Sequence, residues 1–150
     1  MIKQRLFGAF AVALLLVSSA TLGRESTTAE YDQGVKVTSL LQTATTTLGQ
    51  LIEYPKTDRP ELTALEVEIA PGKETGWHKH PVPGYAYVLA GTLTIEMEDG
   101  KHFQFEAGKA FIEVINTLHN GKNLGTELVR LIAFFSGEAG KPFTMRAVKE

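Results

Sequence analysis

The sequence predicts an all-β fold, a sandwich or barrel of short antiparallel strands. Turn signals rich in glycine, proline, asparagine and aspartate recur roughly every 8 to 18 residues from Asp58 to Gly125, a spacing that suits strands better than alternating strands and helices. Between these turns, apolar and polar residues alternate with the period of two that half-buried strands require.

The N-terminus predicts an export signal that is not part of the fold. Lys3 and Arg5 form a positive n-region, residues 6–17 are an almost unbroken apolar run, and small residues at 18–20 precede a cleavage site. The apolar run of about 12 residues is short of the roughly 20 that cross a bilayer as a helix. We therefore expect residues 1–20 to be a secretory signal peptide, with no stable membrane span after cleavage and a periplasmic or secreted product; an uncleaved anchor is the alternative.

Composition limits the partners of the mature chain. Without Lys3 and Arg5, 13 of the 15 basic side chains remain against 17 acidic ones, a formal charge of −4. We expect no nucleic-acid partner, because this balance gives no positive cluster to neutralise phosphates. The chain has no cysteine, and so neither a disulfide nor an acylated cysteine anchor.

The rest of the chain divides into a linker and one domain. Residues 21–34 are polar and are expected to form a flexible linker. Residues 35–150 are expected to form a single domain, which at this size can bury roughly two-thirds of its unfolded surface. A short helix between residues 40 and 51 is disfavoured by the β-branched stretch Thr43 to Thr47.

Three stretches predict individual strands. Apolar residues alternate with glutamates in 65–69 and with threonines and glutamates in 92–98. Asp99-Gly100, between the second stretch and the apolar residues at 103 and 105, predicts a two-residue hairpin turn of type I′. Residues 128–135 are apolar almost throughout and predict a central strand.

His78 and His80 are a candidate pair of metal ligands. Residues at i and i+2 of an extended segment project from the same face, so two imidazoles there can converge on one ion. A helical zinc site would instead place its histidines at i and i+4, and the sequence has no such pair. The alternative is a chance pair on a solvated loop.

The residues around this pair resemble the two motifs of the cupin superfamily. The first motif, G-x5-H-x-H-x3-4-E-x6-G, is matched by Gly72, His78, His80 and Gly91. The second, G-x5-P-x-G-x2-H-x3-N, is matched by Gly108, His119 and Asn123, whereas Val114 and Asn116 replace its proline and glycine. The resemblance covers roughly residues 62–135.

This resemblance implies a double-stranded β-helix, the jelly-roll cupin barrel, in which His78, His80 and His119 meet in one cavity. In most cupins these histidines and the motif glutamate hold a divalent metal. Here the glutamate position falls on Gly84, or on Tyr85 with the longer spacing. Neither residue can provide a carboxylate.

Three consequences of the missing glutamate stay open at this point. Three neutral imidazoles can hold Fe, Ni, Cu or Zn, and the sequence does not select among them. Glu113 could supply the carboxylate, because it precedes His119 among apolar neighbours and an acid in such a run is costly unless partnered; the plainer interpretation places it at a sheet edge or beside Lys or Arg. In the third case no metal binds and the histidines only shape a polar pocket.

We therefore expect an exported single-domain cupin with one divalent metal on His78, His80 and His119, and Glu113 as a candidate fourth ligand. Such a protein could be a dioxygenase-like or Lewis-acid enzyme acting on a small anionic or enolisable molecule. The alternative is a non-catalytic module that binds or senses a small ligand. The resemblance also implies a homodimer. We expect Trp77 to face away from the site and His102 to be exposed, while Asn123 caps a turn.

Overall fold

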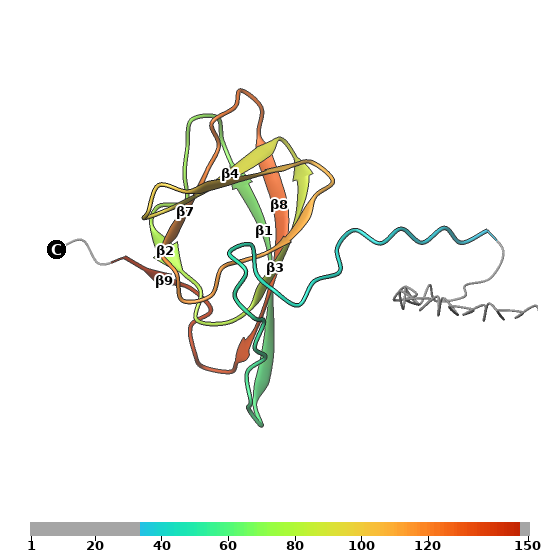
Figure 1. Ribbon diagram of the computed structural model, residues 1–150, viewed down its shortest axis with the longest axis vertical. Helices are drawn as coiled ribbons and strands as arrows, with labels where there is room; N and C mark the ends of the chain where they lie inside the picture. The colour runs from blue at the N-terminus through green and yellow to red at the C-terminus, as the bar shows by residue number, and fades with distance from the viewer. Residues whose placement is uncertain (1–33, 148–150) are drawn as a thin grey trace, which may run out of the picture. The chain divides into compact units, whose positions relative to one another are not determined.

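The computed structural model of the chain describes residues 34–147, in which nine strands form two antiparallel sheets and no helix is long and apolar enough to cross a membrane (Figure 1). The predicted signal peptide and residues 21–33 of the predicted linker lie outside the described residues. The strands all belong to the unit that begins at Thr38. The prediction of an all-β double-stranded β-helix is confirmed.

The first sheet contains the predicted central strand. β8 (Val129–Glu138) lies between β1 (Pro60–Ile69) and β3 (Gly84–Ala90), and β6 (Ala110–Ile112) forms the edge beyond β3. β1 and β8 pair along their full length, from Pro60 opposite Glu138 to Ile69 opposite Val129. The near-continuous apolar run at 128–135 is explained by this position, with a neighbour on each side.

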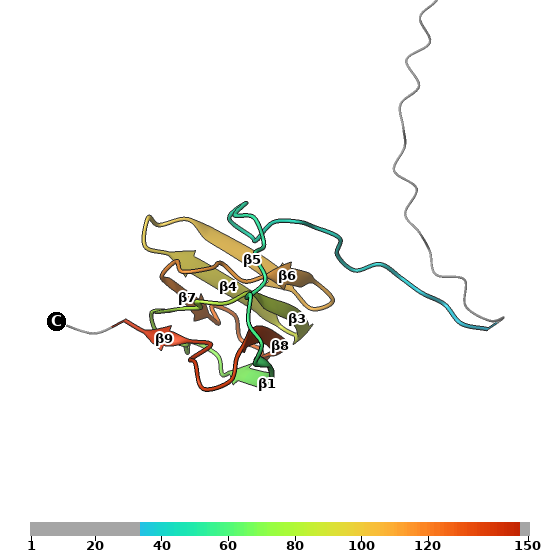
Figure 2. The ribbon, with the colours of Figure 1, turned by 90° about the horizontal axis from the view of Figure 1, so that it is seen from below.

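The second sheet carries two of the three histidines. Its order is β5 (His102–Glu106), β4 (Thr92–Met97), β7 (His119–Lys122), β2 (His78–Lys79) and β9 (Met145–Arg146). Figure 2 shows β5, β4, β7 and β9 in one layer and β6, β3, β8 and β1 in the other. The short β2 is therefore held between strands that are distant in sequence.

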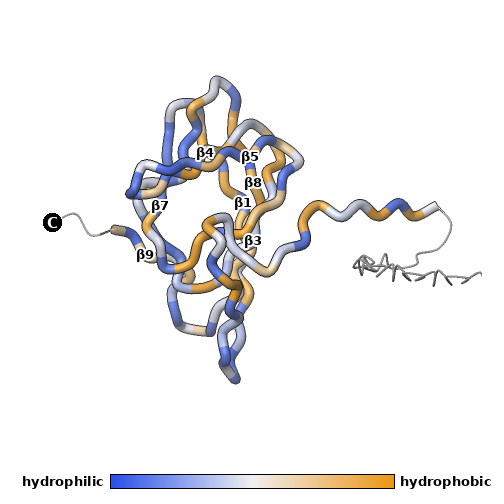
Figure 3. Tube along the Cα trace, in the orientation of Figure 1, coloured by the Kyte–Doolittle hydropathy of each residue, from blue (hydrophilic) through white to orange (hydrophobic). Residues whose placement is uncertain are grey.

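The core lies between the two sheets and follows the predicted alternation. In β8 the inward residues Val129, Leu131, Ala133 and Phe135 are buried, whereas Arg130 and Phe134 on the other face are exposed. Leu93, Ile95 and Met97 of β4 are buried in the same cluster. Hydrophilic residues gather in the connections at the ends of the barrel (Figure 3).

The β4–β5 turn differs from the sequence prediction by one residue. The Met97 amide donates to the Lys101 carbonyl at 2.8 Å, and the Gly100 amide donates to the Met97 carbonyl at 3.0 Å. Gly100 has a φ of 80°, but Asp99 has no positive φ. A type I′ turn needs positive φ at both central residues, so that prediction is wrong; a three-residue loop with glycine in the left-handed position takes its place.

The segment before β1 is not helical. Its side chains form hydrogen bonds that hold the residues following β6 in place. Thr45 forms an isolated bridge with Leu51. The Gln50 side chain accepts from the Ile115 amide at 3.0 Å and donates to the Ile115 carbonyl at 2.9 Å. The Thr47 hydroxyl donates to the Ile112 carbonyl at 2.7 Å. Residues 113 and 114, which belong to no strand, are thus anchored on both sides.

Candidate metal centre

The three predicted histidines come together inside the barrel. His78 on β2 lies directly opposite His119 on β7, and His80, just beyond β2, bridges Ile115. The ring centroids are 4.4 Å apart for His78 and His119, 5.0 Å for His78 and His80, and 5.1 Å for His80 and His119. One nitrogen from each ring lies within 4.8 Å of the other two. His119, which is distant in sequence from the other two, is brought to them by the pairing of β7 with β2.

A backbone carbonyl fixes the tautomer of each ring. Nδ1 of His78 lies 2.7 Å from the Gly76 carbonyl, Nδ1 of His80 lies 3.0 Å from the Phe143 carbonyl, and Nδ1 of His119 lies 2.9 Å from the Thr117 carbonyl. Because a carbonyl oxygen can only accept, each Nδ1 must carry the proton and donate it. Each Nε2 then has a free lone pair, and such outer hydrogen bonds are those that orient metal-binding histidines.

Burial keeps these imidazoles uncharged at neutral pH. It lowers the pKa of His80 to about 3 and that of His119 to about 4. The pKa of His78 is also lowered, first by burial and further by the positive charge of Arg146. Metal ligation requires neutral imidazole, so no proton has to leave these rings before they bind an ion.

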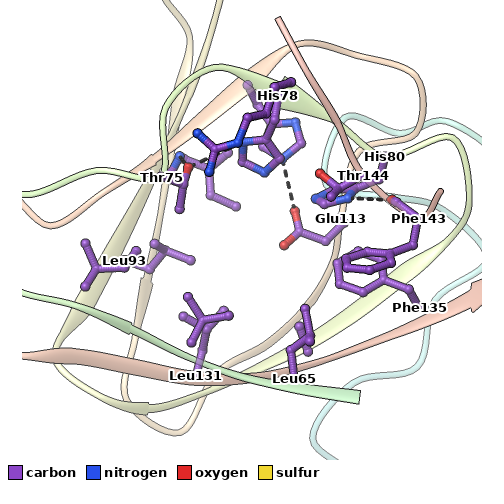
Figure 4. Close-up of a pocket in the computed structure, with 17 residues that line it drawn as sticks. Leu65, Thr75, His78, His80, Leu93, Glu113, Leu131, Phe135, Phe143 and Thr144 are labelled. Atoms are coloured by element: carbon purple, nitrogen blue, oxygen red, sulfur yellow. Dashed lines mark hydrogen bonds and ion pairs between the residues drawn. The ribbon is translucent and has the colours of Figure 1, made fainter. Parts of the chain in front are cut away.

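Glu113 points into the same cavity. Its Oε2 lies 3.7 Å from His119 Nε2, which is too long for a hydrogen bond, and this oxygen has no other hydrogen-bond partner among the described residues (Figure 4). Burial raises the pKa of Glu113 to about 7. The interpretation that Glu113 sits at a sheet edge or beside Lys or Arg is wrong, because its carboxyl group is buried next to the histidine cluster.

Gly84 explains how the carboxylate reaches this position. The Glu113 amide donates to the Gly84 carbonyl at 2.9 Å, so the two residues are neighbours across adjacent segments. A Cβ on Gly84 would lie 2.5 Å from Cε1 of Phe135 and 2.9 Å from Cγ of Glu113. Gly84, at the position of the motif glutamate, therefore has no side chain, and Phe135 and Glu113 occupy the space that such a side chain would need.

The histidines and Glu113 line a cavity of about 300 Å³ within the barrel. Figure 4 shows Thr75, His78 and Thr144 on one side of it, with Leu65 and Leu131 on the opposite side. The apolar part of the wall comes mostly from β1, β4 and β8. A pocket of this size lies at the lower end of the range for small-molecule sites.

The other residues singled out by sequence lie outside the cavity wall. His102 on β5 is exposed, and Trp77 is 37% exposed. Asn123 is buried, and its amide group donates to the carbonyls of Ile69 and Glu127, both at 2.7 Å. Its Oδ1 also accepts from the Gly125 amide at 3.0 Å, which is the predicted turn cap.

Sequence reasoning missed the contribution of the C-terminal segment. Phe143, Thr144 and Arg146 all line the cavity. The Phe143 ring lies 5.0 Å from that of Phe135, and its carbonyl holds His80. These residues follow the second motif by 20 or more positions, and no local pattern marks them.

Comparisons with known proteins agree with this architecture. The family model of the cupin domain matches residues 65–135. The chain is 34% identical over 76 residues to the β-alanine degradation protein BauB of Pseudomonas aeruginosa, a match that covers 47% of this chain and 77% of BauB.

Among solved structures, the polyketide cyclase RemF from Streptomyces resistomycificus is similar with a TM-score of 0.51 and 19% identity, over 67% of this chain and 69% of RemF. A conserved protein from Klebsiella pneumoniae with a double-stranded β-helix domain is similar with a TM-score of 0.50 and 18% identity, over 65% of this chain and 91% of that protein. The chain spans less than half the length of several other solved chains that it matches. The chain belongs to the cupin superfamily.

Proposed function

We propose that the chain is a mononuclear metal cupin, in which the Nε2 atoms of His78, His80 and His119 and the carboxylate of Glu113 hold one divalent ion. The observation that carries this proposal is the set of three Nδ1–H donations to backbone carbonyls, which leaves three lone pairs facing one cavity. The buried, unpartnered Oε2 of Glu113 supports the fourth position. An acid buried without a partner is costly unless it serves such a role.

The donor spacing suits this role. With Zn–N distances of about 2.0 to 2.1 Å, a tetrahedral site separates its nitrogens by about 3.4 Å. The histidine donors here lie within 4.8 Å of one another, so the two nitrogens that are farthest apart need to approach by up to about 1.4 Å on binding. Iron, nickel, copper and zinc all accept this donor set, because imidazole suits each of them.

The chemistry that follows is Lewis-acid or oxygenase-type conversion of a small anionic or enolisable molecule. A divalent ion at this site would supply Lewis acidity and positions for exchangeable ligands. Glu113 would neutralise one of its two charges, leaving a net positive site for an anionic group. The walls of Leu65, Leu131 and Phe135 would keep bulk water away from the reacting atoms. The name of the relative BauB refers to degradation of β-alanine, itself a small carboxylate, which supports this substrate class.

Metal titration of matched histidine variants tests the proposal. Protein without a His-tag is stripped by chelation and titrated with Zn²⁺, Fe²⁺, Ni²⁺ and Cu²⁺. We expect about one tightly bound ion per chain for at least one metal, and loss of that binding in His119→Ala. His102→Ala is the matched control, because it removes the exposed histidine of β5. Equal binding by both variants, or less than about 0.2 ion per chain for every metal, would contradict the proposal.

A second comparison separates an enzyme from a binding module. Metal-loaded protein is incubated with a panel of small carboxylates and β-keto acids in the presence of oxygen, and the products are followed by NMR. Turnover by the wild type and its loss in His119→Ala supports an enzyme. A carboxylate that binds the loaded protein but is recovered unchanged would support a ligand-binding or sensing cupin.

We also propose that the protein is exported and dimeric. The charged, apolar and small-residue pattern of residues 1–20 supports export. N-terminal sequencing of protein from the culture medium or periplasm should give a chain that begins at Thr21. Exposed apolar side chains on the outer face of the first sheet, Leu62 and Phe134, support a sheet-to-sheet homodimer. Analytical ultracentrifugation should then give about twice the monomer mass.

A further inference from the structure

Within residues 34–147, a single lysine or arginine side chain lines the histidine cavity. Arg146 on β9 is the cross-strand partner of His78 on β2. Side chains of directly opposed residues share a face of the sheet, with Cβ atoms about 4.5 to 5.5 Å apart. Arg146 lines the cavity, and its charge contributes to the lowered pKa of His78. The guanidinium group therefore stands beside the histidine cluster, on the same wall.

Arg146 forms no ion pair in the described part of the chain. The ion pairs formed within residues 34–147 involve other basic side chains, among them Arg130 with Glu66 and Lys122 with Glu96. Among the residues that the structure describes, Arg146 is also the only lysine or arginine on the cavity wall, and Glu113 is the only acid there. An exposed arginine next to three neutral imidazoles leaves this rim of the cavity positively charged.

The opposite side of the cavity has a different character. Figure 4 shows Leu65 and Leu131 across from His78 and Thr144. Val67, Ile69 and Ala133 continue this apolar wall. A molecule that fits both sides carries an anionic group at one end and a short apolar body at the other. The volume of about 300 Å³ limits it to a small molecule.

We propose that Arg146 is an anion-binding residue that receives the carboxylate of a small monocarboxylate, with the apolar part of this ligand on the Leu65 and Leu131 side. This assignment specifies the substrate class of the proposed metal centre. It rests on that proposed function, because Arg146 and the histidines line the same cavity. A singly charged carboxylate suits this place, since its two oxygens match one guanidinium fork in bidentate fashion and Arg146 is the one lysine or arginine that the described residues place on the cavity wall. Arg146 selects the ligand and orients it toward the histidines; it is not a metal ligand.

Matched neutral and anionic probes test this assignment directly. Hexanoate and hexanamide share size and apolar chain and differ in charge. Their affinities for full-length protein are measured by NMR titration in the metal-free and zinc-loaded states. We expect about tenfold tighter binding of hexanoate by the wild type, which is what one exposed charge-assisted pair provides. Shortening the acid to butanoate should weaken binding about tenfold, because two methylenes leave the apolar wall.

Three variants separate the guanidinium from general effects of charge. In the metal-free state, Arg146→Gln should bind the acid and the amide about equally. Arg146→Lys should keep only part of the preference, since an ammonium group lacks the planar fork. Arg130→Gln removes an exposed arginine on the outer face of β8 and should behave as the wild type. Circular dichroism and zinc content verify that each variant is folded and keeps its metal.

The outcomes of this experiment are distinct from those of the metal titration. A hexanoate preference in the metal-free protein that Arg146→Gln abolishes, Arg146→Lys reduces and Arg130→Gln leaves unchanged supports the assignment, even if zinc does not bind. Equal binding of hexanoate and hexanamide by the wild type overturns it, and so does an undiminished preference in Arg146→Gln. Absence of hexanoate binding in both metal states overturns it as well.

Discussion

Replacing Glu113 with glutamine is expected to stabilise the metal-free protein while weakening its hold on metal. The carboxyl group is buried and its pKa is raised to about 7 from an ordinary value of 4.5. The folded chain therefore binds more protons than the unfolded chain between about pH 4.5 and pH 7, and stability falls as the pH rises through this window. Each pKa unit corresponds to about 1.36 kcal/mol, so ionised Glu113 costs about 3 kcal/mol at pH 8.

Glutamine has nearly the same shape but no charge, so Glu113→Gln removes this cost. We expect the metal-free variant to be about 3 kcal/mol more stable than the wild type at pH 8 and equally stable near pH 4.5. The lowered pKa values of His80 and His119 act in the opposite direction, adding stability as the pH rises to about 6.5. That contribution is common to both proteins and cancels in the comparison.

Urea denaturation in the presence of a chelator measures the difference. Glu68→Gln is the matched control, because Glu68 is an exposed acid on β1, and its replacement should change stability by no more than about 0.5 kcal/mol. A metal-free Glu113→Gln protein that is no more stable than the wild type at pH 8 would refute the reasoning that Glu113 is buried without a partner. With zinc present, the wild type should be more stable than Glu113→Gln, since the variant lacks the carboxylate ligand.

Further predictions concern protons, packing and a buried cap. Zinc binding at pH 7 should release about half a proton per ion, and nearly one at pH 6, because Glu113 must ionise while the imidazoles are already neutral; calorimetry in buffers of different ionisation enthalpy should find almost none for Glu113→Gln. Gly84→Ala brings a Cβ to 2.5 Å from the Phe135 ring and should cost about 1 to 3 kcal/mol in denaturant unfolding, whereas an unchanged midpoint would contradict the close approach of β3 and β8. Asn123→Ala loses two hydrogen bonds to backbone carbonyls and should cost about 2 kcal/mol without changing zinc stoichiometry; loss of zinc would place Asn123 in the site.

The sequence was informative about the fold because short-range patterns determine it. Alternation at 65–69 and 92–98 predicts β1 and β4, and the apolar run at 128–135 predicts the central β8. The β4–β5 turn shows the limit of local rules. Asp99-Gly100 is compatible with a two-residue turn and with a three-residue loop, and the register of Met97 opposite Lys101 selects the loop.

The site was only partly predictable, because its remaining groups come from segments distant in sequence. Motif spacing brings His78, His80 and His119 together. No spacing rule connects Glu113 to Gly84, since their proximity depends on how the segment after β6 runs beside β3. The contribution of Arg146 depends on β9 pairing with the two-residue strand β2, and neither strand has a periodic pattern long enough to be recognised.

The most direct test of the metal centre is a crystal structure of the metal-loaded protein with anomalous data collected at the absorption edge of the bound metal. We expect one peak per chain inside the barrel, coordinated by Nε2 of His78, His80 and His119 at about 2.0 to 2.1 Å for zinc and by an oxygen of Glu113. Each Nδ1 should remain hydrogen-bonded to its backbone carbonyl. An ion held through Nδ1, an ion without Glu113, or a peak only at surface residues would contradict it.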